Sequence, residues 1–167
     1  MNKSFPILLV EDDPDDVFFV QRAFDSAHLK HPLFAVGDGQ EAINYLSGKG
    51  PYADHSVYPL PQLVLADLKM PRVSGFDLIA WMRNDKQCKL VPIIILSSSA
   101  LPADVNRAYA LGANAYMVKP ADAHSLERLF QTIADFWIAG QKPAVTRSRG
   151  QRTGKTLSTA PSNLTQC

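Results

Sequence analysis

One short apolar run in the middle of the chain restricts the possible folds more than any other feature. Residues 63–66 read Leu-Val-Leu-Ala, preceded by the Pro-Leu-Pro of residues 59–61 and followed closely by Pro71. A strand without polar alternation is buried on both faces, as in a parallel sheet. The run leads into Asp67, and open α/β sheets bind ligands at the carboxyl ends of their strands. Asp67 is therefore a candidate functional carboxylate, although an aspartate in such a place is more often a turn former or helix cap.

Strand-like and helix-like segments alternate along the rest of the chain. Apolar runs predict strands at residues 5–10, 33–36, 63–66, 92–96 and 115–118, and helical periodicity predicts helices at 14–29, 40–46, 75–83, 103–111 and 122–138. Five strand–helix units in this order imply right-handed crossovers and helices on both faces of one sheet. The predicted fold class is α/β, with a doubly wound five-stranded parallel sheet.

The periodicity also predicts which helical residues face the core. The first helix begins at Pro14 behind a cap at Asp13 or Asp12, and its apolar stripe is expected to contain Val17, Val20, Gln21, Phe24 and Leu29, widened by Phe18 and Phe19. The last helix, capped by Asp122, is expected to bury Leu126, Leu129, Phe130, Ile133, Phe136 and Trp137. The long loop at 49–61 is expected to be ordered by its own tyrosines rather than to serve as a partner surface.

Composition indicates one acidic domain with a basic tail. The chain has 167 residues, of which 46% are hydrophobic and 20% charged, enough for a single globular core. Five of the 17 basic residues follow Gly140 without any acid, which leaves 12 basic against 16 acidic residues, or −4, for residues 1–140. Residues 1–140 are predicted to form the domain and 141–167 a disordered basic tail, for which a solubilising role is favoured over nucleic-acid binding.

The cysteines, the N-terminus and the lengths of the apolar segments predict where in the cell the protein is found. Two cysteines, Cys88 and Cys167, do not make a disulfide framework, and the N-terminus carries no secretory pattern. No segment approaches the length of a membrane span, so a cytoplasmic bacterial-type protein without membrane contacts is expected.

Polar residues follow four of the predicted strands. Glu11 and Asp12 come after the first, Asp67 after the third, Ser97 after the fourth and Lys119 after the fifth. In a doubly wound sheet these strands are neighbours, so the side chains should converge at one edge. Clustered carboxylates repel one another unless a cation joins them, and hard oxygen ligands suit Mg²⁺. Carboxylates, Mg²⁺, a lysine and a hydroxyl together predict a site that handles phosphoryl groups.

Four motifs in this order resemble the response-regulator receiver domain of two-component signalling. They are Leu-Leu-Val-Glu-Asp-Asp at 8–13, Asp-Leu-Lys-Met-Pro-Arg-Val-Ser-Gly at 67–75, the strand ending at Ser97, and Gly-Ala-Asn-Ala-Tyr-Met-Val-Lys-Pro at 112–120. The resemblance covers about residues 5–138 and implies a flavodoxin-like receiver fold.

The resemblance also implies roles for the site residues. Asp67 would be the phosphoacceptor and Asp12 a direct Mg²⁺ ligand, with Glu11 acting through water and the Lys69 carbonyl completing the protein ligands. Ser97 and Lys119 would bind the phosphoryl group, and Tyr116 would be the switch aromatic. The Lys119–Pro120 bond would be cis, as in that family.

The partner of such a protein would be a sensor histidine kinase. The loop at 49–61 and the early Glu-Asp-Asp-Pro-Asp-Asp run are similar to single-domain regulators paired with bacterial phytochromes, which makes a phytochrome-type kinase the suspected partner. The polar tail is too short for a DNA-binding domain, so the output is expected to be protein–protein contact, with a homodimer possible, and the protein is not expected to be an enzyme.

Three other functions are considered. A flavodoxin-like FMN carrier shares the architecture, but Glu11, Asp12 and Asp13 would repel the flavin phosphate. A phosphohydrolase of the aspartyl-phosphate type would need a second aspartate where Lys69 stands. A receiver-like scaffold that is never phosphorylated would not need the complete set of site residues.

Overall fold

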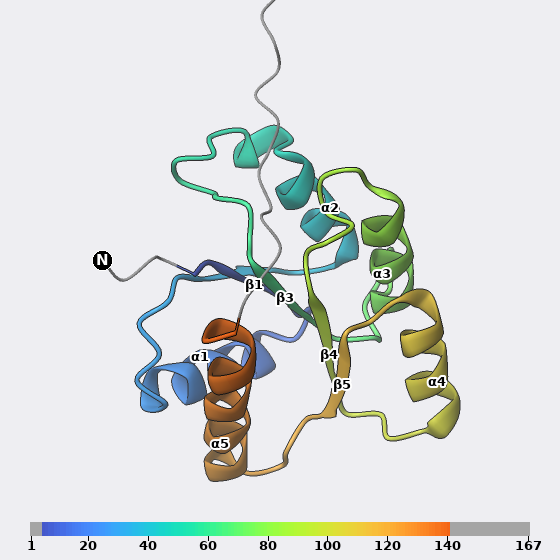
Figure 1. Cartoon of the computed structure of the whole chain (residues 1–167). Coiled ribbons are helices and arrows are strands. Elements are labelled where there is room, and N and C mark those ends of the chain that lie inside the picture. The colour runs from blue at the N-terminus through green and yellow to red at the C-terminus, as the bar shows by residue number, and fades with distance from the viewer. Residues whose placement is uncertain (1–4, 141–167) are drawn as a thin grey trace, which may run out of the picture.

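The computed structural model describes residues 5–140, and its secondary structure alternates between strands and helices as predicted (Figure 1). The predicted disordered tail at 141–167 lies outside the described residues. The strands are β1 (Ile7–Val10), β2 (Leu33–Val36), β3 (Leu63–Ala66), β4 (Ile93–Ser97) and β5 (Ala115–Val118). The helices are α1 (Pro14–Ser26), α2 (Gly39–Ser47), the 3₁₀ turn η1 (Gly50–Tyr52), α3 (Gly75–Asn84), α4 (Pro102–Leu111), α5 (Ala123–Ile133) and the π-helical turn η2 (Ala134–Ile138).

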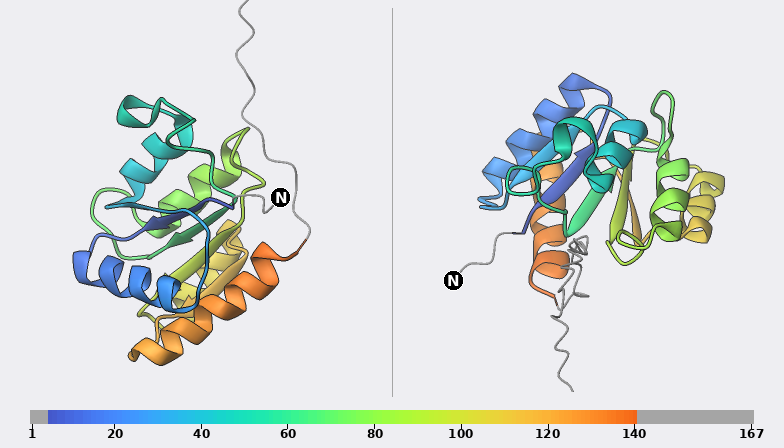
Figure 2. Two further views of the ribbon diagram at one scale, coloured as in Figure 1. Left: turned by 90° about the vertical axis from the view of Figure 1, so that its left-hand side faces the viewer. Right: turned by 90° about the horizontal axis from the view of Figure 1, so that it is seen from above.

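The five strands form one parallel sheet in the order β2-β1-β3-β4-β5. Helices α1 and α5 cover one face, and α2, α3 and α4 cover the other (Figure 2). The chain winds toward β2 in its first unit and toward β5 afterwards, so the direction changes between β1 and β3. This arrangement confirms the doubly wound α/β prediction and places the expected ligand-binding edge beyond the ends of β1 and β3.

The β3 run lacks polar alternation because each of its faces has its own hydrophobic core. Val64 and Ala66 belong to the cluster beneath α2, α3 and α4, whereas Leu63 and Leu65 belong to the cluster beneath α1 and α5. All four residues have an exposed fraction of 0%. Burying a Leu or Val side chain stabilises the fold by about 1.5–3 kcal/mol, so this strand anchors both layers.

Aromatic residues explain the order of the loop at 49–61. Tyr52 and Tyr58 from the loop pack on Tyr45 of α2 and on one another, with ring centroids 5.1–5.9 Å apart. The Tyr45 hydroxyl donates to the Pro59 carbonyl oxygen at 3.1 Å, and the Tyr52 hydroxyl donates to Glu41 Oε1 at 2.9 Å. The prediction that tyrosines order this loop is confirmed.

Three aromatic side chains assigned to the core are exposed instead. Phe18 and Phe19 of α1 are each 53% exposed, and Phe136 is 69% exposed. In α1, residues Val20, Ala23 and Phe24 already fill the narrow inward stripe, so widening that stripe to 18 and 19 was wrong. At the end of α5, the chain passes into η2, which changes the helical phase, and Phe136 packs its ring against Trp137 rather than into the core.

Within the described residues, none of the helices is both long enough and apolar enough to span a bilayer.

Candidate functional site

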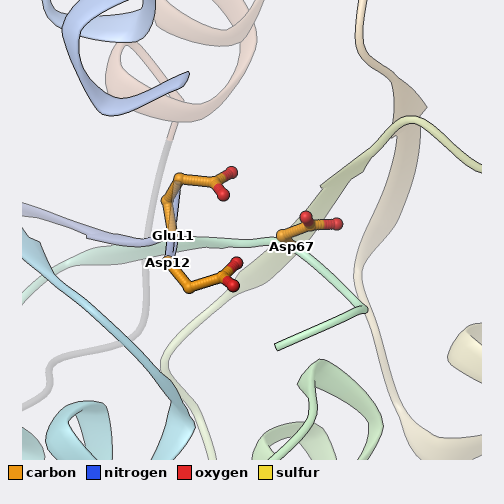
Figure 3. A group of neighbouring side chains, drawn as sticks. All are labelled: Glu11, Asp12 and Asp67. Carbon is orange, nitrogen blue, oxygen red and sulfur yellow. The ribbon is translucent and has the colours of Figure 1, made fainter. Parts of the chain in front are cut away.

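Three carboxylates meet where β1 and β3 end. The two strands pair in parallel with Val10 opposite Ala66, so the residues that follow them emerge side by side. One oxygen from each of Glu11, Asp12 and Asp67 lies within 4.8 Å of the others (Figure 3). The predicted acidic cluster is therefore present, and its donor set of carboxylate oxygens suits a hard cation such as Mg²⁺.

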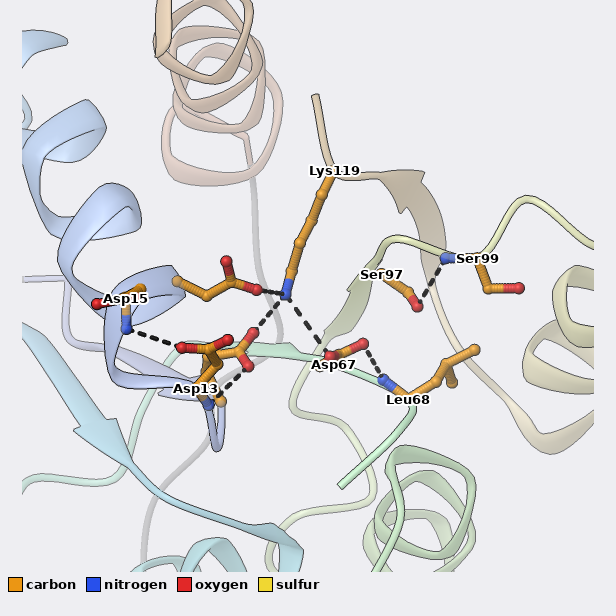
Figure 4. A network of polar contacts seen from close by, with 9 residues as sticks. Asp13, Asp15, Asp67, Leu68, Ser97, Ser99 and Lys119 are labelled. Atoms are coloured by element: carbon orange, nitrogen blue, oxygen red, sulfur yellow. Dashed lines mark hydrogen bonds and ion pairs between the residues drawn. The ribbon is translucent and has the colours of Figure 1, made fainter. Parts of the chain in front are cut away.

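Lys119 enters the same site from the end of β5. Its backbone N–H donates to the Ser97 carbonyl oxygen, which fixes the residue beside β4. Its Nζ lies 2.5 Å from Glu11 Oε2 and 3.6 Å from Asp67 Oδ2 (Figure 4). The ammonium thus bridges carboxylates from two different strand ends and offsets part of their mutual repulsion.

Burial and ion pairing have opposite effects on the pKa values of Glu11 and Lys119. Burial raises the pKa of Glu11, because a charged carboxylate is poorly solvated there, while the hydrogen bonds from Lys119 and from the Asp13 N–H oppose that rise. For Lys119, burial alone would lower the pKa, but the hydrogen bonds to Asp16 and Glu11 outweigh it and raise the pKa. The lysine therefore stays charged at neutral pH.

Asp16 is a member of this site that sequence reasoning missed. It lies in the first turn of α1, and its Oδ2 is 2.7 Å from Lys119 Nζ. Nothing in the spacing of Asp15 and Asp16 separates the carboxylate that contacts the lysine from the one that does not. The only available signal was that α1 begins directly after the acidic strand end.

The loop after β3 holds Asp67 in place. Asp67 Oδ1 accepts a hydrogen bond from the Leu68 N–H at 2.6 Å, so one carboxylate oxygen is anchored while Oδ2 faces Lys119. Gly75 closes the loop beneath it, and a Cβ at this position would stand 2.2 Å from the Asp67 carbonyl oxygen. The glycine at the end of the 67–75 motif is thus required by a close approach of two backbone segments.

An ion pair connects the loop between Asp67 and Gly75 to the start of α2. Arg72 adopts a left-handed backbone conformation (φ 65°), and its guanidinium forms an ion pair with Asp38 at the start of α2. Burial alone would raise the pKa of Asp38, but hydrogen bonds from Arg72 and from the Glu41 N–H lower it. Lys69 lies in this loop with an exposed side chain, so the backbone carbonyl is the group that remains a candidate ligand.

Ser97 and Tyr116 are joined through a third residue, Ser99. The buried Ser97 accepts a hydrogen bond at Oγ from the Ser99 N–H at 3.2 Å, and the Tyr116 hydroxyl donates to the Ser99 carbonyl oxygen at 2.8 Å. The Ser99 hydroxyl donates to Asp104 Oδ2 in α4 at 2.6 Å. The sequence predicted roles for Ser97 and Tyr116, at the two ends of this series of hydrogen bonds, but not for Ser99. Residues 97–99 are all serines, and nothing in the sequence showed that Ser99 forms the link.

One expectation taken from the family resemblance is not met. The described residues contain no cis peptide bond, so the Lys119–Pro120 bond is trans and the prediction of a cis bond is wrong for this structure. A bond to proline has only a small intrinsic preference between the two isomers, so the surrounding packing decides the outcome and the sequence motif does not.

A groove opens beside the charged cluster. It has a volume of about 750 Å³ and runs between α1 and the segment from Lys119 into α5. Its lining includes Asp16, Phe19, Arg22, Lys119, Asp122 and Glu127. The groove therefore reaches Asp16 and Lys119, which contact the acidic cluster, and its volume is large enough for a side chain of another molecule.

A family model of the response regulator receiver domain matches residues 7–131. The chain belongs to this family, a class of signalling proteins. It is similar to the response regulator Rcp1 of Synechocystis sp., with 32% identity over 132 residues that span 79% of this chain and 88% of Rcp1.

Solved structures of related regulators agree with this assignment. The response regulator RPA3017 in red light signalling of R. palustris superposes with a TM-score of 0.80 and 30% identity, covering 84% of this chain and 99% of RPA3017. The phosphorylated cyanobacterial phytochrome response regulator RcpA gives a TM-score of 0.77 and 32% identity, over 84% of this chain and 99% of RcpA. The Mn²⁺-bound form of Rcp1 gives a TM-score of 0.73 and 31% identity, over 84% of this chain and 99% of the Rcp1 chain. The predicted flavodoxin-like receiver fold is confirmed.

Proposed function

We propose that Asp67 accepts a phosphoryl group from the phosphohistidine of a sensor histidine kinase, in a Mg²⁺-dependent reaction, and that the protein then signals through protein–protein contacts. The observation that carries this proposal is the position of Asp67. One of its oxygens is anchored by the Leu68 N–H, and the other lies 3.6 Å from a lysine within an acidic cluster beside an open groove. The relative RcpA, whose structure is of the phosphorylated protein, supports the same chemistry.

In the proposed step, a carboxylate oxygen of Asp67 attacks the phosphorus of the donor. A P–O bond forms while the P–N bond to the kinase histidine breaks, and the leaving nitrogen keeps the electron pair. Lys119 would pair with a phosphoryl oxygen, and the Ser97 hydroxyl would donate to another. Both contacts are charge-assisted hydrogen bonds, which are among the stronger polar interactions in proteins.

Glu11, Asp12, Asp67 and the Lys69 carbonyl would hold Mg²⁺. The three carboxylates fit this ion, since their oxygens lie close together and would otherwise repel one another. When bound, Mg²⁺ would offset negative charge on the carboxylates and on the transferred group. The Mn²⁺-bound form of Rcp1 is consistent with a divalent cation in this family.

The protein is proposed to be a switch rather than an enzyme. A phosphohydrolase would need an acid or base two residues after its nucleophile, and Lys69 stands there with an exposed side chain. Slow hydrolysis of the phosphoryl group would keep the protein phosphorylated long enough to contact a partner protein. The structural change on phosphorylation would pass from Ser97 through Ser99 to Tyr116 and α4, which are linked by the hydrogen bonds described above.

The partner is proposed to be a phytochrome-type histidine kinase in the cytoplasm. Two similar structures are those of a response regulator in red light signalling and of a phytochrome response regulator, which favours this kinase class. The donor would approach along the groove between α1 and α5, since Lys119 is one of the residues that line it. A homodimer would give a second protein–protein contact, and nucleic acid is not proposed as a partner.

Phosphorylation by a small donor tests the central assignment. Incubation with acetyl phosphate and MgCl₂ should add one phosphate, measured by intact mass, and chelation of Mg²⁺ should prevent it. Asp67→Asn should remove the labelling, whereas Asp54→Asn, in an exposed turn of the loop at 49–61, should leave it unchanged. Equal labelling of the Asp67→Asn variant would refute the proposed phosphoacceptor. Phosphotransfer from a panel of sensor kinases would test the phytochrome assignment, because a phytochrome-type kinase should label the protein fastest.

A further inference from the structure

Lys119 has a carboxylate partner that the proposed reaction does not require. Its Nζ lies 2.5 Å from Glu11 Oε2, 2.7 Å from Asp16 Oδ2 and 3.6 Å from Asp67 Oδ2. Asp16 is therefore nearer to the ammonium than the proposed phosphoacceptor is. It is also the only one of these three acids that belongs to a helix rather than to the end of a strand.

The two close partners of the lysine differ in how readily they can release it. The side chain of Glu11 is 2% exposed, so its charge would be left without solvent if the lysine moved away. The side chain of Asp16 is 41% exposed, and water can replace the lysine there. A partly exposed ion pair contributes only about 0.2–1 kcal/mol, so the contact with Asp16 is the one that can be exchanged at small cost.

Phosphorylation of Asp67 would favour the movement of Lys119 from Asp16 to the phosphoryl group. An ammonium has three donors, and in this structure two of them serve Glu11 and Asp16. A phosphoryl group carries a charge of about −1.5 to −2 and three acceptor oxygens. Once on Asp67, it would attract Lys119 more strongly than the unmodified carboxylate does at 3.6 Å.

We propose that Asp16 is a positioning residue that holds Lys119 beside α1 in the resting receiver and gives it up when Asp67 is phosphorylated. The inference rests on the proposed function and adds a residue to it. The Asp16 contact favours the resting state, because it exists only before the lysine turns to the phosphoryl group. Asp16 also shares the positive charge of the ammonium with Glu11 and Asp67, two of the carboxylates that would hold Mg²⁺.

Asp16→Asn in the full chain tests this proposal through two binding titrations, in which affinity should change in opposite directions. Binding of MgCl₂ alone should weaken, because the released lysine competes with the cation for Glu11 and Asp67. Binding of beryllofluoride, a phosphoryl mimic, at saturating MgCl₂ should tighten, because the lysine no longer has to leave Asp16. Each dissociation constant, measured by calorimetry, should change by up to about fivefold, the factor that one partly exposed ion pair supplies.

Two matched variants separate this role from a general effect of charge. Asp15→Asn removes the same charge from the same exposed turn of α1, next to Asp16, and should change both constants by much less. Asp16→Glu keeps the carboxylate and should restore values near those of the wild type. In the metal-free proteins, the Nζ signal of Lys119 in ¹⁵N-lysine NMR should shift in Asp16→Asn and remain in place in Asp15→Asn.

The outcomes also distinguish this inference from the proposed function. If wild-type protein is phosphorylated on Asp67 but Asp16→Asn binds beryllofluoride no more tightly than wild type or Asp15→Asn does, the positioning role is refuted and the function stands. A loss of binding in both titrations would indicate structural damage by the substitution and would equally overturn the proposal. Failure of wild type itself to bind beryllofluoride or accept phosphate would instead refute the function.

Discussion

Two partly buried regions of this receiver are held together in opposite ways. At the carboxyl ends of the strands, a charged cluster consists of Glu11, Asp12, Asp16, Asp67 and Lys119. Beneath the loop at 49–61, an aromatic cluster consists of Phe34, Tyr45, Tyr52 and Tyr58. The charged cluster places three acids, Glu11, Asp16 and Asp67, within 3.6 Å of one lysine, so attraction and repulsion oppose each other within it. The aromatic cluster combines ring contacts with hydroxyl hydrogen bonds that support one another.

The difference indicates which part of the molecule can change state. In the charged cluster, adding or removing one charge changes which partner Lys119 prefers, so a phosphoryl group or a cation can rearrange it. In the aromatic cluster, the ring contacts and the hydroxyl hydrogen bonds do not depend on a bound ion. Stability measurements with and without Mg²⁺ should therefore separate the two regions.

The largest loss of stability is expected in the aromatic cluster. Tyr45 is 1% exposed and packs against three other aromatic rings. Tyr45→Ala should lower the free energy of unfolding by about 3–5 kcal/mol, as for other large-to-small aromatic changes in cores. Chemical denaturation measures this loss, which Mg²⁺ should not restore. Tyr45→Phe keeps the ring, removes the hydrogen bond to Pro59 and should cost about 1 kcal/mol. A strong rescue of Tyr45→Ala by Mg²⁺ would contradict the separation of the two regions.

A smaller but Mg²⁺-dependent loss is expected in the charged cluster. Lys119→Met leaves the buried Glu11 without its cation, which should lower the free energy of unfolding by roughly 2–3 kcal/mol in EDTA, less than for a fully enclosed pair. Mg²⁺ should restore part of this stability by taking the place of the ammonium. Lys86→Met, at an exposed lysine outside the cluster, should change stability by less than about 0.5 kcal/mol in either buffer. If Lys119→Met responds to Mg²⁺ no more than Lys86→Met does, the electrostatic balance described here is wrong.

The aromatic cluster should show its own charge dependence only at alkaline pH. Burial, together with the hydrogen bond to Glu41, raises the pKa of Tyr52 to about 12, above the value of about 10 for an unfolded tyrosine. A raised pKa stabilises the fold fully below pH 10, and this contribution is lost as the pH rises toward 12. Tyr52→Phe should therefore cost about 1–2 kcal/mol at pH 7, and its difference from wild type should shrink between about pH 10 and 12. A difference that stays constant across this range would show that the hydrogen bond to Glu41 is not responsible.

The smallest change in stability, but a large change in response, is expected for Ser97→Ala. The substitution removes one hydrogen bond, from the Ser99 N–H, and should cost about 0.5–1.5 kcal/mol. It should also reduce the NMR shift changes that phosphorylation is expected to produce at residues 103–138, because the proposed route from the phosphoryl group to Tyr116 begins at this hydroxyl. Equal shift changes in Ser97→Ala and wild type would mean that the charged cluster does not act through Ser97.

The sequence by itself determined the elements and the strand ends that carry the site. Burial on both faces made β3 visible, since a strand between two helical layers has no room for polar alternation. The edge strands β2 and β5 are only partly buried, yet their short apolar runs also marked their observed bounds. Local capping chemistry marked the starts of α1 and α5, where Asp13 and Asp122 accept hydrogen bonds from backbone N–H groups two and three residues later. Parallel pairing then brought the predicted carboxylates together, because neighbouring strands must end at the same edge.

Only the tertiary structure decided which of several similar side chains complete that site. Asp16 and Lys119 are separated by 103 positions in the chain, and their contact depends on how α1 is rotated on the sheet. The same rotation leaves Phe18 and Phe19 exposed, although their apolarity is equal to that of Phe24 in the core. Periodicity identifies a helical face to within a residue or two, whereas a hydrogen bond requires an accuracy of a few tenths of an ångström. That accuracy comes from the packing of both layers against the sheet, which no local pattern in the sequence contains.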